Sequence, residues 1–108
     1  MIRDRGERRA KPRISEPYPA TVRGLDGSGW AFEEETVLDN LSAGGLYLRL
    51  PRSIHPGARL FIVFRLSTSP YERDPSSVVA VRGVVLRAEL QPDGSCGLAV
   101  TFRHYRFL

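Results

Sequence analysis

The sequence has a single cysteine, Cys96, among its 108 residues. A disulfide within the chain and a metal site built from several cysteines are therefore both excluded. No run approaches the roughly 18 apolar residues that a membrane-spanning helix needs, and the first residues lack the apolar segment of a secretory signal. We therefore expect a cytoplasmic protein with no membrane span.

Residue types that carry catalysis or bind metals are also scarce. Only two histidines are present, His55 in a Pro/Gly turn and His104 near the last residues, and neither has a partner at a metal-ligand spacing. The acidic run 33–35 would alternate between the two faces of a strand, which is typical of a solvated surface rather than of a cation site. Phosphate-binding glycine loops that open a helix are absent. These absences predict a protein that is not an enzyme and that holds no metal or cofactor.

Lysine is nearly absent: the sequence has one lysine, Lys11, and fifteen arginines. Residues 1–13 contain six basic and only two acidic residues, so this segment carries the whole net charge of +4 and residues 14–108 are neutral overall. A segment so rich in charge buries too little apolar surface to order itself. We expect residues 1–13 to form a flexible basic arm that meets an anionic partner, and residues 14–108 to form one domain.

No segment shows the 3.6-residue apolar period of a helix, and prolines and glycines are spread too evenly for a long one. Leu46, Leu48 and Leu50 instead alternate with other residues, the period of two that is typical of a half-buried strand. Six segments alternate in this way or are rich in β-branched residues: 18–25, 31–38, 46–50, 60–66, 78–90 and 98–102. They predict an all-β fold, a small antiparallel barrel or sandwich, with residues 104–108 as a helical turn or frayed chain.

Three arginines, Arg8, Arg9 and Arg13, cluster in the arm just before the first predicted strand. A guanidinium group can fork onto phosphate oxygens, fork onto the O6 and N7 edge of guanine, or stack on a base. A guanine nucleotide offers all three targets at once, although two arginines four residues apart also arise by chance in a basic arm.

A second cluster, of small polar residues, lies directly before the predicted strand 46–50. Asn40 and Ser42 have short side chains that can reach ring nitrogens and exocyclic groups of a base, while Gly44 and Gly45 leave room for a ligand or a tight turn. Asn, Ser and Gly are also the commonest turn residues, so a simple strand connection would have the same composition.

In this order, the two clusters resemble the motifs of the PilZ domain family, bacterial receptors for the second messenger cyclic di-GMP. The first motif is Arg9-x-x-x-Arg13 and the second is Asn40-x-Ser42-x-x-Gly45. The glycine pair leading into a strand, and the segments 56–64, 81–85 and 97–102, are similar to further signatures of the family, so the resemblance covers about residues 8–103. It implies a six-stranded antiparallel β-barrel onto which the arm wraps.

The resemblance also assigns roles to these residues. It implies that Arg9 and Arg13 grip the phosphates and guanines, and that the second motif, with Gly44 inside it, lies on the barrel surface and hydrogen-bonds a guanine. Asn40 stands where the family more often has Asp. An amide donates as well as accepts, whereas a carboxylate would pair more strongly with the N1 and N2 donors of guanine.

Arg8 immediately precedes the first motif arginine, and in the family this implies two intercalated ligand molecules rather than one. Ligand binding would then order the arm against the barrel and create a face for a downstream protein effector.

Two other functions stay open. A single-stranded nucleic-acid-binding barrel would explain the arm and the strands but explains the Asn40 motif poorly, and it expects exposed aromatic platforms, for which Tyr47 and Phe61 are candidates. A PilZ-like barrel that has lost its ligand would bind only proteins. The presence of both motifs favours cyclic di-GMP and disfavours nucleic acid.

Overall fold

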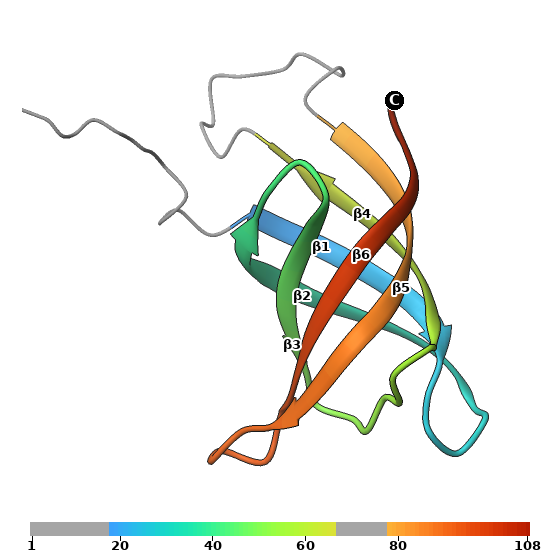
Figure 1. Ribbon diagram of the computed structural model, residues 1–108, viewed down its shortest axis with the longest axis vertical. Helices are drawn as coiled ribbons and strands as arrows, with labels where there is room; N and C mark the ends of the chain where they lie inside the picture. Colours follow the sequence, from blue (N-terminus) through green and yellow to red (C-terminus); the bar gives the residue numbers. More distant parts are fainter. Residues whose placement is uncertain (1–17, 67–77) are drawn as a thin grey trace, which may run out of the picture.

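The computed structural model describes residues 18–66 and 78–108, in which six strands close into a barrel (Figure 1). The strands are β1 (Tyr18–Leu25), β2 (Ala31–Leu41), β3 (Gly45–Leu50), β4 (Arg59–Arg65), β5 (Val78–Leu90) and β6 (Cys96–Phe107). All neighbours are antiparallel in the order β1-β2-β3-β6-β5-β4, and β4 pairs again with β1. The described residues contain no helix, so the prediction of an all-β, six-stranded antiparallel barrel is confirmed. The predicted arm, with Arg8, Arg9 and Arg13, lies outside the described residues.

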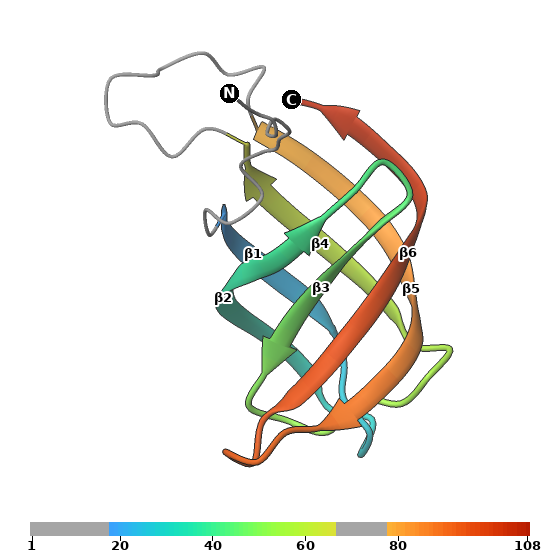
Figure 2. The same cartoon turned by 60° about the vertical axis from the view of Figure 1, so that its left-hand side comes forward.

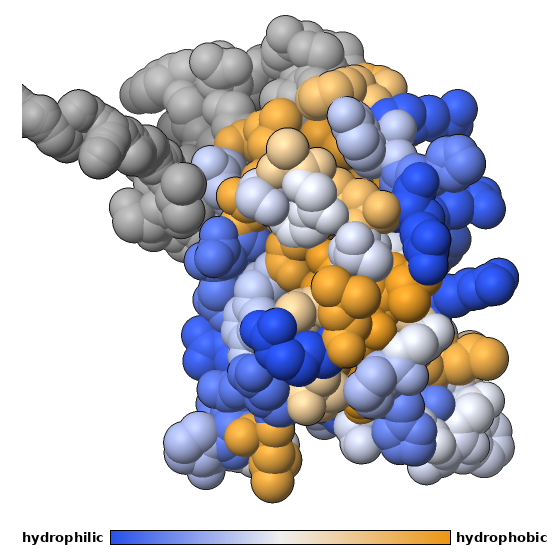
Figure 3. Space-filling model, in the orientation of Figure 1, coloured by the Kyte–Doolittle hydropathy of each residue, from blue (hydrophilic) through white to orange (hydrophobic). Residues whose placement is uncertain are grey.

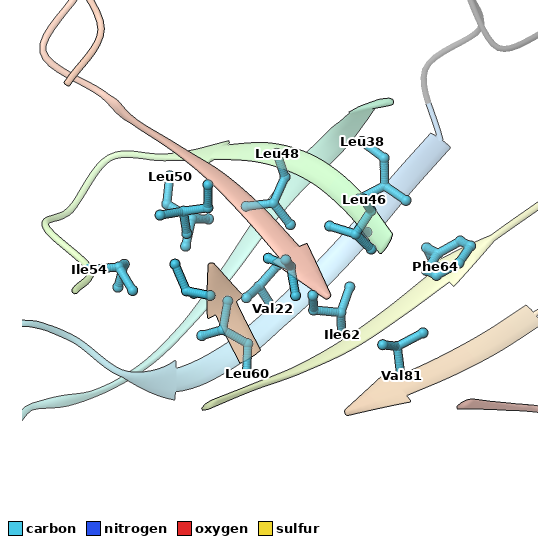
Figure 4. Close-up of a cluster of buried hydrophobic side chains, with 14 of the residues drawn as sticks. Val22, Leu38, Leu46, Leu48, Leu50, Ile54, Leu60, Ile62, Phe64 and Val81 are labelled. Carbon is cyan, nitrogen blue, oxygen red and sulfur yellow. The ribbon is translucent and has the colours of Figure 1, made fainter. Parts of the chain in front are cut away.

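Alternate residues of each strand fill the interior of the barrel, as the apolar period of two predicts. Leu46, Leu48 and Leu50 of β3 are at most 6% exposed, and the alternate apolar residues of β4 are also buried. Figure 4 shows how these side chains meet others from β1, β2 and β5 in one cluster, and the labelled members are Val22, Leu38, Leu46, Leu48, Leu50, Ile54, Leu60, Ile62, Phe64 and Val81. Each such side chain contributes about 1.5–3 kcal/mol when it leaves water, so this cluster is what holds the strands in register.

The antiparallel order divides the connections between two ends of the barrel. The start of β1, the β2–β3 turn and the last residues of β6 lie at one end, which we call the upper end (Figures 1 and 2). The β1–β2, β3–β4 and β5–β6 connections lie at the other, lower end. Anything attached before Tyr18 therefore leaves the barrel at the same end as the β2–β3 turn.

Three β-bulges interrupt the register, and each has one extra residue in one strand. The extra residues are Asp39 in β2, Leu86 in β5 and Arg103 in β6. Each is followed by another exposed residue, so a bulge turns two consecutive side chains to the outer surface where regular alternation would turn one inward.

The prediction of a helical turn or frayed chain at residues 104–108 is wrong. β6 continues to Phe107 because it stays paired with β5, from His104 opposite Arg82 to Phe107 opposite Val79. On its other side β6 loses its neighbour after Thr101, where β3 begins at Gly45. These residues of β6 are therefore exposed, although Tyr105 and Phe107 alternate with His104 and Arg106 in the sequence. Residues 18–66 and 78–108 include no helix with the length and hydrophobicity of a membrane span.

Candidate functional site

The second motif forms the turn between β2 and β3 at the upper end of the barrel (Figure 2). The backbone N–H of Ser42 donates to the Gly45 carbonyl at 2.9 Å, and its Oγ donates to the same oxygen at 3.2 Å. The Gly44 carbonyl accepts a hydrogen bond from the backbone N–H of Phe102 in β6 at 3.0 Å. The turn is thus fixed to a third strand. The Ser42 hydroxyl donates its hydrogen bond within the turn, and its oxygen can still accept a hydrogen bond from a ligand.

The bulge at the end of β2 presents Asp39 and Asn40 side by side, and only one of them is already paired. Arg49 donates to Asp39 through Nε at 2.9 Å and through Nη2 at 3.2 Å. This hydrogen-bonded pair raises the pKa of Arg49 and occupies both oxygens of the carboxylate. The side-chain amide of Asn40 is exposed and makes no hydrogen bond to any residue of 18–66 or 78–108. Asn40 is therefore the polar group that this turn leaves available.

The two glycines of the motif have different surroundings. A Cβ at Gly45 would lie 2.5 Å from the backbone oxygen of Val100 in β6, so glycine is required there for the two strands to approach. A Cβ at Gly44 would meet nothing within 4 Å among the described residues. Packing explains Gly45, whereas the space at Gly44 is open to a ligand.

A hollow of about 500 Å³ lies beside this turn. Asn40, Ser42 and Gly45 form one side of it, and Leu86 and Arg87 of β5 form another. The same face carries a hydrophobic area over β3 and β6, which can be followed in the middle of Figure 3. Sequence analysis missed Leu86 and Arg87, because only the bulge in β5 turns both toward the hollow.

A hydrogen-bond network fixes the floor of the hollow. The Tyr47 hydroxyl donates to Glu89 at 3.0 Å and accepts from Gln91 at 3.2 Å. Burial, together with the hydrogen bond to Glu89, raises the pKa of Tyr47. Arg87 donates to the second oxygen of Glu89 at 2.9 Å, and the hydrogen bonds from Arg87 and Tyr47 lower the pKa of Glu89. Tyr47 is thus held in place, whereas Arg87, with 63% of its side chain exposed, has further donors for a phosphate.

The other residues considered in the sequence have structural surroundings. Cys96 starts β6 as a half-buried free thiol. Glu34, from the acidic run, pairs with Arg52 at 2.5 Å, so this one carboxylate of the run belongs to an ion-pair network at the lower end. Among the residues that the structure describes, no three His, Cys, Asp or Glu side chains are grouped so that they could hold a metal ion.

The structure brings Asn40, Ser42, Gly44 and Gly45 together, while the three arm arginines lie outside the part it describes. The described residues do show where the chain before Tyr18 joins the barrel. Tyr18 pairs with Leu38, only two residues before Asn40. In the sequence Arg13 precedes Tyr18 by five residues, and five residues of any chain reach at most about 18 Å.

Comparison with known proteins agrees with this geometry. The family model described as the PilZ domain matches residues 7–106 of the chain. The chain is also similar to a solved structure of the Bacillus subtilis inhibitor of motility (MotI/DgrA), with a TM-score of 0.63 and 19% sequence identity over 95% of this chain and 49% of that chain. The chain thus spans about half the length of that structure, and at this identity the likeness shows the fold alone. No curated protein sequence matches the chain.

Proposed function

Because the chain belongs to the PilZ domain family, whose members are receptors for cyclic di-GMP, we propose that it binds this dinucleotide at the upper end of the barrel. PilZ domains act as binding and effector domains rather than as catalysts, so the proposed output is a changed surface. The observation that carries the proposal is the exposed Asn40 amide, without a hydrogen bond to the described residues, beside the open space at Gly44.

Each residue of the turn has a proposed part in binding. The Asn40 amide can donate to and accept from the edge of a guanine, and the Ser42 oxygen accepts one of its N–H groups. The missing side chain at Gly44 lets the base approach the backbone, and Gly45 holds β3 against β6 so that the turn keeps its shape. Arg87, across the hollow, can exchange its bond to Glu89 for a ligand phosphate.

The arm supplies the remaining groups in this proposal. Arg9 and Arg13 fork onto phosphates and guanine edges, and Arg8 favours a stacked pair of ligand molecules. Two cyclic di-GMP molecules carry four phosphate charges, which balance the +4 of residues 1–13. Because the arm joins β1 beside the β2–β3 turn, these charges can meet on one surface without any movement of the barrel.

We propose that this closure of the arm over the hollow is the signal. It would replace a bare, polar end of the barrel with a surface made of arm, ligand and turn together, which a downstream protein effector recognises.

Calorimetric titration of the full chain with cyclic di-GMP tests the assignment. We expect two ligand molecules per chain for the wild type, and one for Arg8→Ala. Arg9→Ala or Arg13→Ala should weaken binding at least tenfold, because each loses a charge-assisted pair worth about 1.5–3 kcal/mol.

Arg5→Ala is the matched control, because it removes an arginine of the same arm outside the motif. An equal loss in Arg5→Ala would mean that the arm acts only through its charge. Undiminished affinity in Arg9→Ala and Arg13→Ala would contradict the proposed clamp, and wild-type saturation at one ligand would contradict the stacked pair.

A further inference from the structure

A larger hollow, of about 890 Å³, lies on a different part of the barrel wall, over β1, β4, β5 and β6. A single cross-strand row crosses it, in which Arg23 faces Phe61, Phe61 faces Arg82, and Arg82 faces His104. Two more arginines line the same hollow. We call this surface the arginine groove, and its residues are Arg23, Arg59, Phe61, Arg82, Arg103 and His104. It presents four guanidinium groups, and no carboxylate of residues 18–66 or 78–108 lines it.

The bulge in β6 helps to build this groove. Arg103 is the extra residue opposite the step from Arg82 to Gly83. Regular alternation would turn either Arg103 or His104 into the barrel, whereas both are exposed. A bulge of this kind re-aims a side chain at the cost of a regular ladder, and here it adds a guanidinium group to a cluster that already carries positive charge.

Three arginines elsewhere on the described surface are already paired with carboxylates, unlike those of the groove. Arg49, Arg52 and Arg87 each form an ion pair with a carboxylate. The four arginines of the groove form no ion pair with residues 18–66 or 78–108. Even Arg23, whose cross-strand neighbour in β2 is Glu33, does not pair with it. Four uncompensated positive charges on one wall repel one another and attract an anion.

Phe61 gives the groove a flat platform. Its ring is half-buried between the neighbouring strands, and the guanidinium carbon of Arg23 lies 5.3 Å from the ring centroid. The Arg23 plane, supported by this aromatic ring, offers a face on which a base can stack. Arg82 lies farther along the row and Arg103, the bulge residue, lines the hollow beside His104, so both can fork onto phosphate oxygens.

We propose that the arginine groove binds single-stranded nucleic acid. The row spans four strands, about 14 Å at the usual strand spacing, so several guanidinium groups can meet successive phosphates. An acidic protein segment would also be attracted, but protein interfaces have an apolar centre that is depleted of charged residues, and a polar rim. A wall with charge of one sign and an arginine-aromatic platform is typical of nucleic-acid sites. This proposal departs from the sequence expectation that disfavoured nucleic acid.

The test is fluorescence anisotropy of a short labelled single-stranded oligonucleotide with the full chain, repeated from low to physiological salt. Arg82→Gln/Arg103→Gln should weaken binding about tenfold at low salt and flatten the plot of log K against log salt by about 1.4, since each lost phosphate contact removes about 0.7 from the slope for a single strand. Phe61→Leu should weaken binding about fivefold through lost stacking. The arm is constant in all variants, so its charge cancels in the comparison.

Arg49→Gln is the matched control, because this arginine lies on the outer surface but is already paired with Asp39, and we expect unchanged oligonucleotide affinity. Unchanged affinity and slope in the double variant would overturn the proposal. So would a polyglutamate peptide that competes as well as the oligonucleotide while Phe61→Leu has no effect, since that result identifies an acidic protein partner. Thermal unfolding of each variant checks the fold, and cyclic di-GMP titration of the double variant should be unchanged, so this proposal and the receptor function can fail separately.

Discussion

Two turns of this barrel have nearly the same residue types. They differ in whether an acidic or amide side chain, Asp26 in one and Asn40 in the other, is hydrogen-bonded to the described residues. In the β1–β2 turn at the lower end, Asp26 accepts hydrogen bonds from the backbone N–H groups of Ser28 at 2.9 Å and Trp30 at 3.0 Å, and its other oxygen pairs with Arg52 at 3.2 Å. In the β2–β3 turn at the upper end, the Asn40 amide bonds to no described residue. The first turn uses its Asp26 side chain to hold itself together, whereas the second, which Ser42 holds together, leaves the Asn40 side chain exposed.

The difference shows how a binding surface is separated from a structural turn. At the lower end the hydrogen bonds from Trp30 and Ser28 and the pairing with Arg52 hold the pKa of Asp26 below its usual value, so the carboxylate is committed to the fold. At the upper end the Asp39 carboxylate is paired with Arg49. The bulge places Asn40 beside it, and the Asn40 side chain makes no hydrogen bond to the described residues. The two turns have similar residue types, and they differ in which side chains are already hydrogen-bonded.

We expect the largest effect from a substitution at Gly45 of the upper turn, and a much smaller effect on stability from the same substitution at Gly44. Gly45→Ala should lower the free energy of unfolding by about 1–3 kcal/mol, because the new Cβ meets the Val100 carbonyl 2.5 Å away. Gly44→Ala should change it by less than about 0.5 kcal/mol, yet weaken cyclic di-GMP binding by filling the space that the ligand needs. Urea unfolding and calorimetry measure the two quantities. Equal stability losses in both variants would remove the distinction between a packing glycine and a ligand glycine.

We expect effects of intermediate size when the Asn40 and Asp26 side chains are removed in turn. Asn40→Ala should weaken cyclic di-GMP binding about fivefold, the value of one hydrogen bond, and leave the melting temperature unchanged. Asp26→Ala should do the reverse and lower the melting temperature by several degrees with unchanged affinity. Asn40→Asp should bind more tightly than the wild type, because a carboxylate pairs more strongly with guanine N–H groups. A melting temperature that falls equally in Asn40→Ala and Asp26→Ala would show that both turns are structural.

The smallest effect is a dependence on pH. Because the folded-state pKa of Asp26 is lowered, the unfolded chain takes up the proton first as the pH falls. The stability that Asp26 contributes is present above its unfolded pKa of about 4 and is lost as the pH falls through the lower folded value. Urea midpoints measured across this range should fall less steeply in Asp26→Asn than in the wild type. Asn40→Ala should keep the wild-type slope, and a changed slope there would place the linked group elsewhere.

The strands could be predicted from the sequence because a barrel buries one face of each. Leu46, Leu48 and Leu50 had to alternate with exposed residues, and the predicted segment 46–50 differs from the observed β3 by one residue. The last residues of β6 lie beyond the start of β3 and bury little, so no pattern of burial marks them. Their strand depends on pairing with a segment some 25 residues earlier, which a local pattern does not encode.

The candidate site was predictable only in part, for a related reason. Asn40, Ser42, Gly44 and Gly45 lie in one short segment, so their meeting in one turn follows from the sequence. Leu86 and Arg87 reach the same hollow through a bulge and a shared neighbour in β6. The arginine groove is the extreme case, because Arg23 and His104 come together only through the register of four strands.

The strand order also has a consequence for how the chain reaches its folded state. β6, the last of the six in chain order, lies between β3 and β5. Before β6 is added, an assembly of the first five strands has two unpaired edges, one along β3 and one along β5, and such edges pair readily with other chains. Completion of the barrel by β6 therefore removes both sites of aggregation in one step. During synthesis, the period between the emergence of β5 and that of β6 is the one in which a chaperone would protect this protein most.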